Sequence, residues 1–113
     1  MADYPDSSNF FSSLKTELSR RQVAHLYEPL GWAIGKCSWT DYGIQSPWAD
    51  LIIEAESPVL MHGPVANVLV NAEHILSPLR AAGVAYSAEC YDEAGNLLRE
   101  IKWSPASDNH HVS

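Results

Sequence analysis

The sequence predicts a single small, acidic α+β domain whose elements follow the order α-β-β-α-β-β. Two segments near residues 10–18 and 65–79 repeat apolar residues at helical spacing. Three stretches, 32–39, 48–56 and 84–103, are rich in apolar and β-branched or aromatic residues, and the last contains a glycine turn at its centre. The economical arrangement is a four-stranded, mostly antiparallel sheet with helices on one face.

The chain length sets the domain organisation. With 113 residues, of which 46% are hydrophobic and 19% charged, the chain fits one globular domain. We expect a frayed N-terminus over 1–8, the domain over 9–103, and a disordered tail over the polar residues 104–113. No internal repeat or low-complexity block divides the sequence.

The first predicted helix follows a polar N-terminus that supplies candidate caps. The candidate caps are Ser7, Ser8 and Asn9. The apolar residues that follow at helical spacing are Phe10, Phe11, Leu14 and Leu18. The pattern weakens at 19–21, resumes through Val23 and Leu26, and stops before Pro29.

The next segments predict a long-looped hairpin. Residues 32–39 form its first strand, 40–47 a loop containing Asp41, Gly43 and Pro47, and 48–56 its second strand. The segment 57–64 carries Pro58 and Gly63 and predicts a connection.

The second predicted helix has the clearest pattern. Pro64 suits its first turn, and apolar residues from Val65 to Leu79 follow the helical period. Pro78 should kink or shorten the last turn, and Gly83 is a natural cap.

The last two strands flank a turn at 92–95. A four-residue loop pairs Tyr91 with Asn96, Cys90 with Leu97, Tyr86 with Ile101 and Val84 with Trp103. This register gathers the large apolar groups on one face and the set Ser87, Glu89, Glu100 and Lys102 on the other. A five-residue loop would instead place Glu100 and Lys102 beside Tyr86 and Cys90, which burial disfavours.

Charge and targeting patterns exclude several function classes. A formal net charge of −7, with only seven Lys and Arg residues, disfavours a nucleic-acid partner. No apolar run is long enough to span a membrane, and no secretory signal precedes the domain. Two cysteines are too few for a disulfide scaffold, so we expect a soluble, reduced, cytoplasmic protein without a membrane partner.

The titratable residues do not form a catalytic or metal-binding motif. Neither the histidines nor the cysteines show metal-ligand spacing, so no metal and no cofactor are expected, and an enzyme is the less favoured class. His62 is the one ligand candidate, because it lies just before the N-terminus of the second predicted helix, where an anion could bind.

The most unusual feature of the sequence is aromatic. Four tryptophans occur in this short chain, and strand alternation leaves several large apolar residues of the first hairpin uncovered. The interface candidates are Trp32, Ile34, Trp48 and Ile52, with Asp50 and Glu54 as charged rim residues. In the alternative interpretation, the terminal segments or the 40–47 loop cover these residues.

The leading hypothesis is therefore a non-enzymatic interaction or regulatory module. It would bind a protein partner, or itself as a homodimer, through an aromatic-rich sheet face. The alternative is a small-molecule-binding domain or minor enzyme with a helix N-terminal site near His62. A third hypothesis is an accessory subunit whose fold needs a neighbour.

Overall fold

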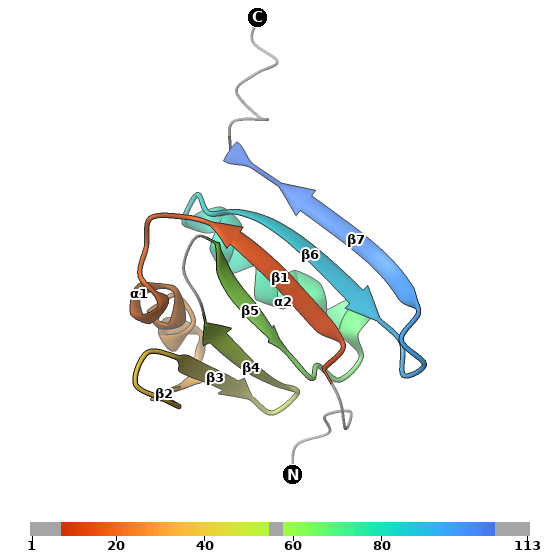
Figure 1. The fold of residues 1–113 in the computed structure, drawn as a ribbon, viewed down its shortest axis with the longest axis horizontal. Helices are drawn as coiled ribbons and strands as arrows, with labels where there is room; N and C mark the ends of the chain where they lie inside the picture. The colour runs from red at the N-terminus through yellow and green to blue at the C-terminus, as the bar shows by residue number, and fades with distance from the viewer. Residues whose placement is uncertain (1–7, 55–57, 106–113) are drawn as a thin grey trace, which may run out of the picture.

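The structure, a computed structural model, is built on one antiparallel sheet of seven strands in the order β2-β3-β4-β5-β1-β6-β7 (Figure 1). It describes residues 8–54 and 58–105. The predicted frayed residues 1–7 and the tail residues 106–113 lie outside these ranges. Within these ranges, no helix has the length and apolar character that crossing a membrane requires.

The elements show that the predicted four-stranded sheet and its α-β-β-α-β-β order are wrong. Three segments predicted as helix, loop or connection are strands. In chain order the elements are β1 (Phe10–Lys15), α1 (Arg20–His25), the 3₁₀ turn η1 (Glu28–Leu30), β2 (Ala33–Lys36), β3 (Tyr42–Ser46), β4 (Ala49–Glu54), β5 (Val59–Gly63), α2 (Val68–Ala81), β6 (Ala85–Tyr91) and β7 (Leu97–Trp103).

The largest correction concerns the first predicted helix, whose N-terminal part is the inner strand β1. Figure 1 shows β1 running between β5 and β6, and it pairs antiparallel with both. Phe10, Ser12 and Leu14 are all buried, a period of two. The Ser12 hydroxyl donates to the carbonyl oxygen of Met61 at 2.7 Å, so its burial leaves no polar atom unpaired. Serine is a weak helix former, so Ser12 and Ser13 do not favour a helix over a strand in this segment.

Strands β3 and β5 replace the predicted loop and connection. In β5 the buried residues Val59, Met61 and Gly63 alternate with half-buried ones, as expected for a strand with one covered face. Pro58 precedes β5 and Pro64 follows it, so neither proline removes a hydrogen bond from inside the strand. The two prolines therefore mark the ends of a strand, and the predicted connection over 57–64 is wrong.

The first helix begins at the position where the predicted helical pattern weakens. Ser19 caps α1 through a hydrogen bond from the Gln22 backbone N–H to its hydroxyl oxygen. The Gln22 side chain accepts from the Ser19 backbone N–H in return, which completes a capping box. The box explains why α1 starts at Arg20 and not near Phe10.

Helix α2 matches the predicted second helix in its body but not at its start. Pro64 and Val65 continue along β4, because Asp50 N–H donates to the Pro64 carbonyl and Ala49 bridges Val65. The helix therefore begins only at Val68. It passes through Pro78 to Ala81, and Gly83 follows with a φ of 74°.

The register of the last hairpin differs from the predicted one. Tyr91 pairs with Leu97, and a bulge then shifts the ladder so that Tyr86 pairs with Trp103, not Ile101. A five-residue loop without the bulge would turn each side chain of β7 to the other face of the sheet. The bulge adds one residue and returns the apolar side chains of Ile101 and Trp103 to the face of the buried residues of β6. Glu89 pairs with Glu100 and Ser87 with Lys102, so these four residues share the side away from the buried residues, as the sequence predicts, although their pairing differs from the predicted one.

One face of the sheet carries the core. Helix α1 packs on β3 and β4, and α2 packs on β6 and β7. The sheet residues buried beneath the helices include Ile44, Leu51, Ile53, Met61 and Ala88. The Tyr27 hydroxyl donates to the Ile75 carbonyl at 2.6 Å and joins the α1 region to α2. Burial raises the pKa of Tyr27, so this hydroxyl keeps its proton. We call the opposite side of the sheet the open face.

A close backbone approach at the end of β5 gives the first prediction. A Cβ at position 63 would collide with the backbone carbonyl of Asp50, whereas a Cβ at Gly35 in β2 would meet nothing within 4 Å. Gly63→Ala should lower the free energy of unfolding by about 1–3 kcal/mol. Gly35→Ala, the control, should change it by less than about 1 kcal/mol. Urea denaturation measures both, and equal values for the two variants would contradict this packing.

Candidate functional site

The centre of the open face is a row of side chains from five neighbouring strands. Cross-strand pairs join Gly43 to Ile52, Ile52 to His62, His62 to Phe11, and Phe11 to Glu89. Directly paired residues project to the same side of a sheet. The row therefore crosses the middle of the sheet from β3 to β6.

Aromatic rings pack against one another within this row. The Phe11 ring stacks on His62 with a centroid distance of 5.8 Å and an interplanar angle of 14°. The edge contact of Phe11 with Tyr91 has a centroid distance of 5.7 Å. Phe11 nevertheless stays 41% exposed, and Ile52 beside His62 is also exposed. The rings are held in place without being covered.

Carboxylates fix the two outer rings. The Glu54 Oε2 atom lies 2.8 Å from Nε2 of His62, and the Tyr91 hydroxyl donates to Oε1 of Glu89 at 2.8 Å. The hydrogen bond to Glu89 raises the pKa of the Tyr91 hydroxyl, and partial desolvation and the charges of Glu89 and Glu100 act in the same direction. We call Phe11, Ile52, Glu54, His62, Glu89 and Tyr91 together the Phe11 cluster.

The surface beside this cluster is slightly hollowed. A shallow depression of about 280 Å³ lies between Phe11, Leu60 and Ser87. The small side chains of Ser13 and Ser87 form part of its floor. A flat partner surface with one protruding side chain would fit such a depression.

The predicted interface residues divide between the two faces. Asp50, Ile52 and Glu54 alternate with the buried residues of β4 and so lie on the open face. Trp32 is only 8% exposed and makes edge contacts with the rings of Tyr27 and Trp48. The predicted exposure of Trp32 is therefore wrong.

Trp48 and Ile34 also belong to the helix side. Trp48 is half-buried with its ring 6.0 Å from His74 of α2, and Ile34 pairs with buried Ile44. Alternation within 48–56 predicts Trp48 on the face of Ile52, but β4 begins only at Ala49 and Trp48 lies in the turn before it. The segment predicted as a loop is strand β3, which carries the core face on to β2, where Ile34 pairs with Ile44.

His62 lies on the side of the sheet opposite to α2. It alternates in β5 with Met61 and Gly63, which are buried beneath the helices. The structure therefore does not bring His62 to the N-terminus of α2, which begins further along at Val68. Its partners are Phe11 and Glu54 instead.

Sequence reasoning missed Phe11 and Tyr91, the two rings on either side of Glu89. The sequence predicts Phe11 within a helix beside Phe10 and places Tyr91 only at the end of a hairpin strand. The available signal was the pair Phe10-Phe11 followed by Ser12, because adjacent aromatics in a strand must point to opposite faces.

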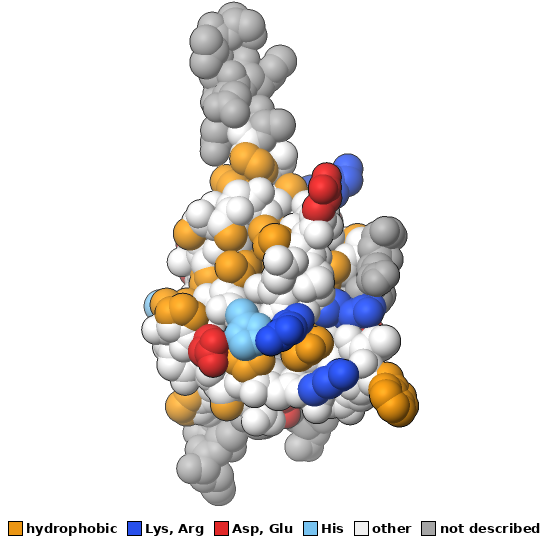
Figure 2. Space-filling model, turned by 90° about the vertical axis from the view of Figure 1, so that its left-hand side faces the viewer, with side chains coloured by type: hydrophobic (Ala, Val, Ile, Leu, Met, Phe, Trp, Pro, Cys, Tyr) orange, Lys and Arg blue, Asp and Glu red, His pale blue; other side chains and the backbone are white. Residues whose placement is uncertain are grey.

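The charges of the molecule are unevenly distributed. Figure 2 shows Lys and Arg side chains around a histidine at the end of the molecule where α1 contributes Arg20, Arg21 and His25. The open face carries Asp50, Glu54, Glu89 and Glu100, with the lysines 15 and 102 toward one end of its strands. The surroundings of the Phe11 cluster are thus acidic.

Within residues 8–54 and 58–105, no group of three metal-ligating side chains is assembled. Comparison with known proteins gives no match to a family model, to a curated protein or to a solved structure.

The two cysteines give a test of burial. Cys37 is exposed beyond β2, whereas Cys90 is buried in β6, where desolvation raises the pKa of its thiol against the opposing charge of Arg99. One thiol per native chain should react rapidly with Ellman's reagent, and Cys37→Ser should abolish that fast phase. The second thiol should react only in denaturant. Two fast thiols in the native protein would contradict the burial of Cys90.

Proposed function

We propose that this protein is a non-enzymatic interaction module whose open sheet face binds a basic segment of a partner protein. The observation that carries the proposal is the exposure of Phe11 at the centre of the sheet, packed on two rings and flanked by two carboxylates.

The placement of Phe11 distinguishes it from a scattered surface residue. Phe11 is an exposed phenylalanine on an inner strand. Its ring contacts Tyr91, Leu60 lines the same depression, and exposed Ile52 lies beyond His62 in the same row. Covering one large aromatic ring removes about 150–250 Å² from water, and such rings dominate binding energies at interfaces. The contacts with His62 and Tyr91 also restrict the ring before binding, so less side-chain entropy is lost when a partner covers it.

The charge of the face selects the chemistry of the partner. Asp50, Glu54 and Glu89 surround the rings, and Glu100 continues the acidic row on β7. A lysine or arginine side chain of the partner could stack on the Phe11 or Tyr91 ring while its charged group meets Glu89. A partner with an acidic contact surface would be repelled.

The same charges disfavour self-association through this face. In a face-to-face dimer, Glu54 and Glu89 of one copy would meet the same residues of the other copy near the centre of the contact. Like charges brought together and desolvated cost binding energy. We therefore propose a different protein as the partner. We also propose a cytoplasmic location, since an exposed thiol such as Cys37 persists in a reducing compartment.

The adjacent phenylalanines provide matched variants for stability. Phe10 is fully buried and Phe11 is 41% exposed, although they are neighbours in β1. Phe10→Ala should lower the free energy of unfolding by about 3–5 kcal/mol. Phe11→Ala should lower it by about 1 kcal/mol or less. Urea denaturation of both variants checks the assignment of faces, which is wrong if Phe11→Ala is the more destabilised.

Capture of partners from the protein's own host tests the function. The baits are the wild type, Phe11→Ala, and Trp39→Ala, in which a 92% exposed tryptophan outside the open face is removed. A specific partner should bind the wild type and Trp39→Ala equally, and Phe11→Ala at least roughly tenfold more weakly. Its affinity should fall with added salt and with the Glu54→Gln and Glu89→Gln substitutions.

Two results would overturn the proposal. A partner retained equally by Phe11→Ala and the wild type binds elsewhere on the molecule. A homodimer that Phe11→Ala dissociates, measured by analytical ultracentrifugation, would assign the open face to self-association instead.

A further inference from the structure

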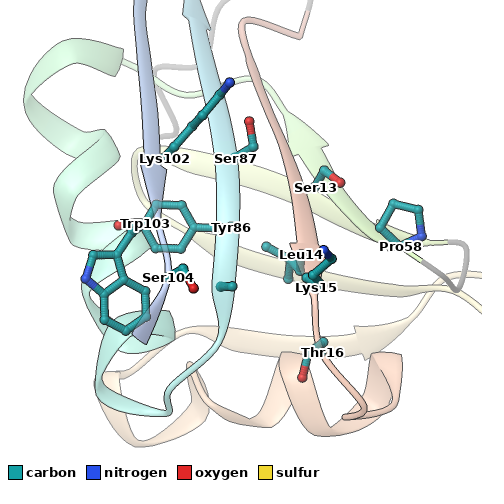
Figure 3. Close-up of a pocket in the computed structure, with 11 residues that line it drawn as sticks. Ser13, Leu14, Lys15, Thr16, Pro58, Tyr86, Ser87, Lys102, Trp103 and Ser104 are labelled. Carbon is teal, nitrogen blue, oxygen red and sulfur yellow. The ribbon is translucent and has the colours of Figure 1, made fainter. Parts of the chain in front are cut away.

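A second and larger cavity lies at the end of the sheet where β1 and β7 finish, and residues of both faces line it. Its volume is about 780 Å³, and β1, β6 and β7 supply most of its lining (Figure 3). It is distinct from the Phe11 cluster, with which it shares no residue. Ligand sites in proteins commonly enclose about 300–1,000 Å³.

The strand register explains why the surface is hollow here. Ser13 pairs with Ser87, and Lys15 pairs with Ala85, so the middle of the floor consists of small side chains. On the next strand, Lys102 pairs with Ser87. Two long lysine side chains therefore stand on either side of small ones, and Figure 3 shows Lys102, Ser87 and Ser13 on the three neighbouring strands.

The lysines give this cavity a charge opposite to that of the protein. Lys15 and Lys102 are two of the three lysines in a chain whose formal net charge is −7. The Lys102 ammonium is 3.9 Å from the Glu100 carboxylate, at the limit of an ion pair. No ion pair joins Lys15 to a carboxylate within residues 8–54 and 58–105.

The other walls of the cavity are apolar or carry hydroxyl groups. Trp103 stacks on Tyr86 with a centroid distance of 6.0 Å on the helix side of the strands, where Leu14 is also buried, and the exposed Pro58 lines the space as well. Ser13 and Ser87 add hydroxyl groups that can donate to an anion from the floor.

We propose that this cavity binds a small organic anion: a flat, apolar body carrying a carboxylate or a phosphate group. The anionic group lies between the ammonium groups of Lys15 and Lys102 and accepts hydrogen bonds from Ser87. The apolar body lies against the exposed Pro58. Charge-assisted hydrogen bonds from two lysines hold the anion, and the apolar part of the lining favours a ligand with an apolar portion.

This proposal does not rest on the protein-binding face. The Phe11 cluster and the cavity use different side chains, so Phe11→Ala should leave anion binding unchanged. The double substitution Lys15→Met/Lys102→Met should likewise leave the Phe11 ring and its contacts with His62 and Tyr91 in place, so that a partner still binds through Phe11. Each proposal can therefore fail without the other.

The first experiment is an NMR titration of the full chain with three matched probes at neutral pH. The probes are 2-naphthoate, 2-naphthyl phosphate and the uncharged 2-naphthol. At least one of the two anions should give saturable shifts at residues 13, 15, 87 and 102, and the stronger of them identifies the preferred anionic group. The uncharged 2-naphthol should bind more weakly than that anion by roughly tenfold, since it lacks both charge interactions.

Three variants then test the geometry with opposite expected signs. The double variant Lys15→Met/Lys102→Met should weaken binding of the preferred anion roughly tenfold. Glu100→Gln, which removes the carboxylate that competes for Lys102, should strengthen it roughly twofold. Lys36→Met removes an exposed lysine of β2 outside the cavity and should have no effect.

Several outcomes would overturn the proposal. One is equal binding of 2-naphthol and the anions, which would make the cavity merely apolar. Shifts confined to other residues, no saturable shift with either anion, or equal weakening by Lys36→Met and the double lysine variant would each contradict it as well.

Discussion

The insertion of β1 between β5 and β6 is the constraint on which the rest of the structure depends. These partners lie about fifty and seventy-five residues away along the chain, so the sheet closes only through non-local pairing. The Asn9 side chain reinforces the junction with two hydrogen bonds to the backbone of Val65, 2.8 and 2.9 Å long. Without β1 the sheet would separate into a β2–β5 unit and a β6–β7 hairpin. With β1 in place, the alternation of its residues sends Phe10 into the core and Phe11 to the open face.

That alternation also explains how much of the structure the sequence could predict. The body of α2 and its Gly83 terminus follow from local signals, namely a helical period and a residue that tolerates positive φ. The two faces of the last hairpin were predicted because burial separates Tyr86 from Glu89 in any register that folds. The position of the bulge was not predictable, because it depends on how β7 packs against β6, and no residue type in the sequence indicates it.

The site was less predictable than the fold, for a related physical reason. Whether Trp48 or Phe11 is exposed depends on which face the helices cover, and that follows from strand partners distant in sequence. Phe10, Phe11 and Leu14 satisfy a helical spacing, while Phe10, Ser12 and Leu14 satisfy the strand spacing that the structure adopts. The serine hydroxyl between two apolar residues conceals the second pattern, because its burial becomes acceptable only when the Met61 carbonyl accepts a hydrogen bond from it. Asp50, Ile52 and Glu54 were assigned to one face correctly, since that assignment needed only the alternation within β4.

The open face combines two surfaces of opposite charge on one sheet, and the register determines their separation. Successive rows of cross-strand pairs carry Phe11 with Glu89 and Glu100, then Ser13 with Ser87 and Lys102, then Lys15 with Ala85. The charge thus changes sign over two residues along a strand, a distance of about 7 Å. At physiological ionic strength the screening length is about 8 Å, which is no shorter than this separation, so the charges of each surface are felt at the other. Glu100 links them most directly, because it belongs to the acidic row and also approaches Lys102. A basic partner that engages Glu100 would free the Lys102 ammonium for an anion, which would couple the two surfaces through that one carboxylate.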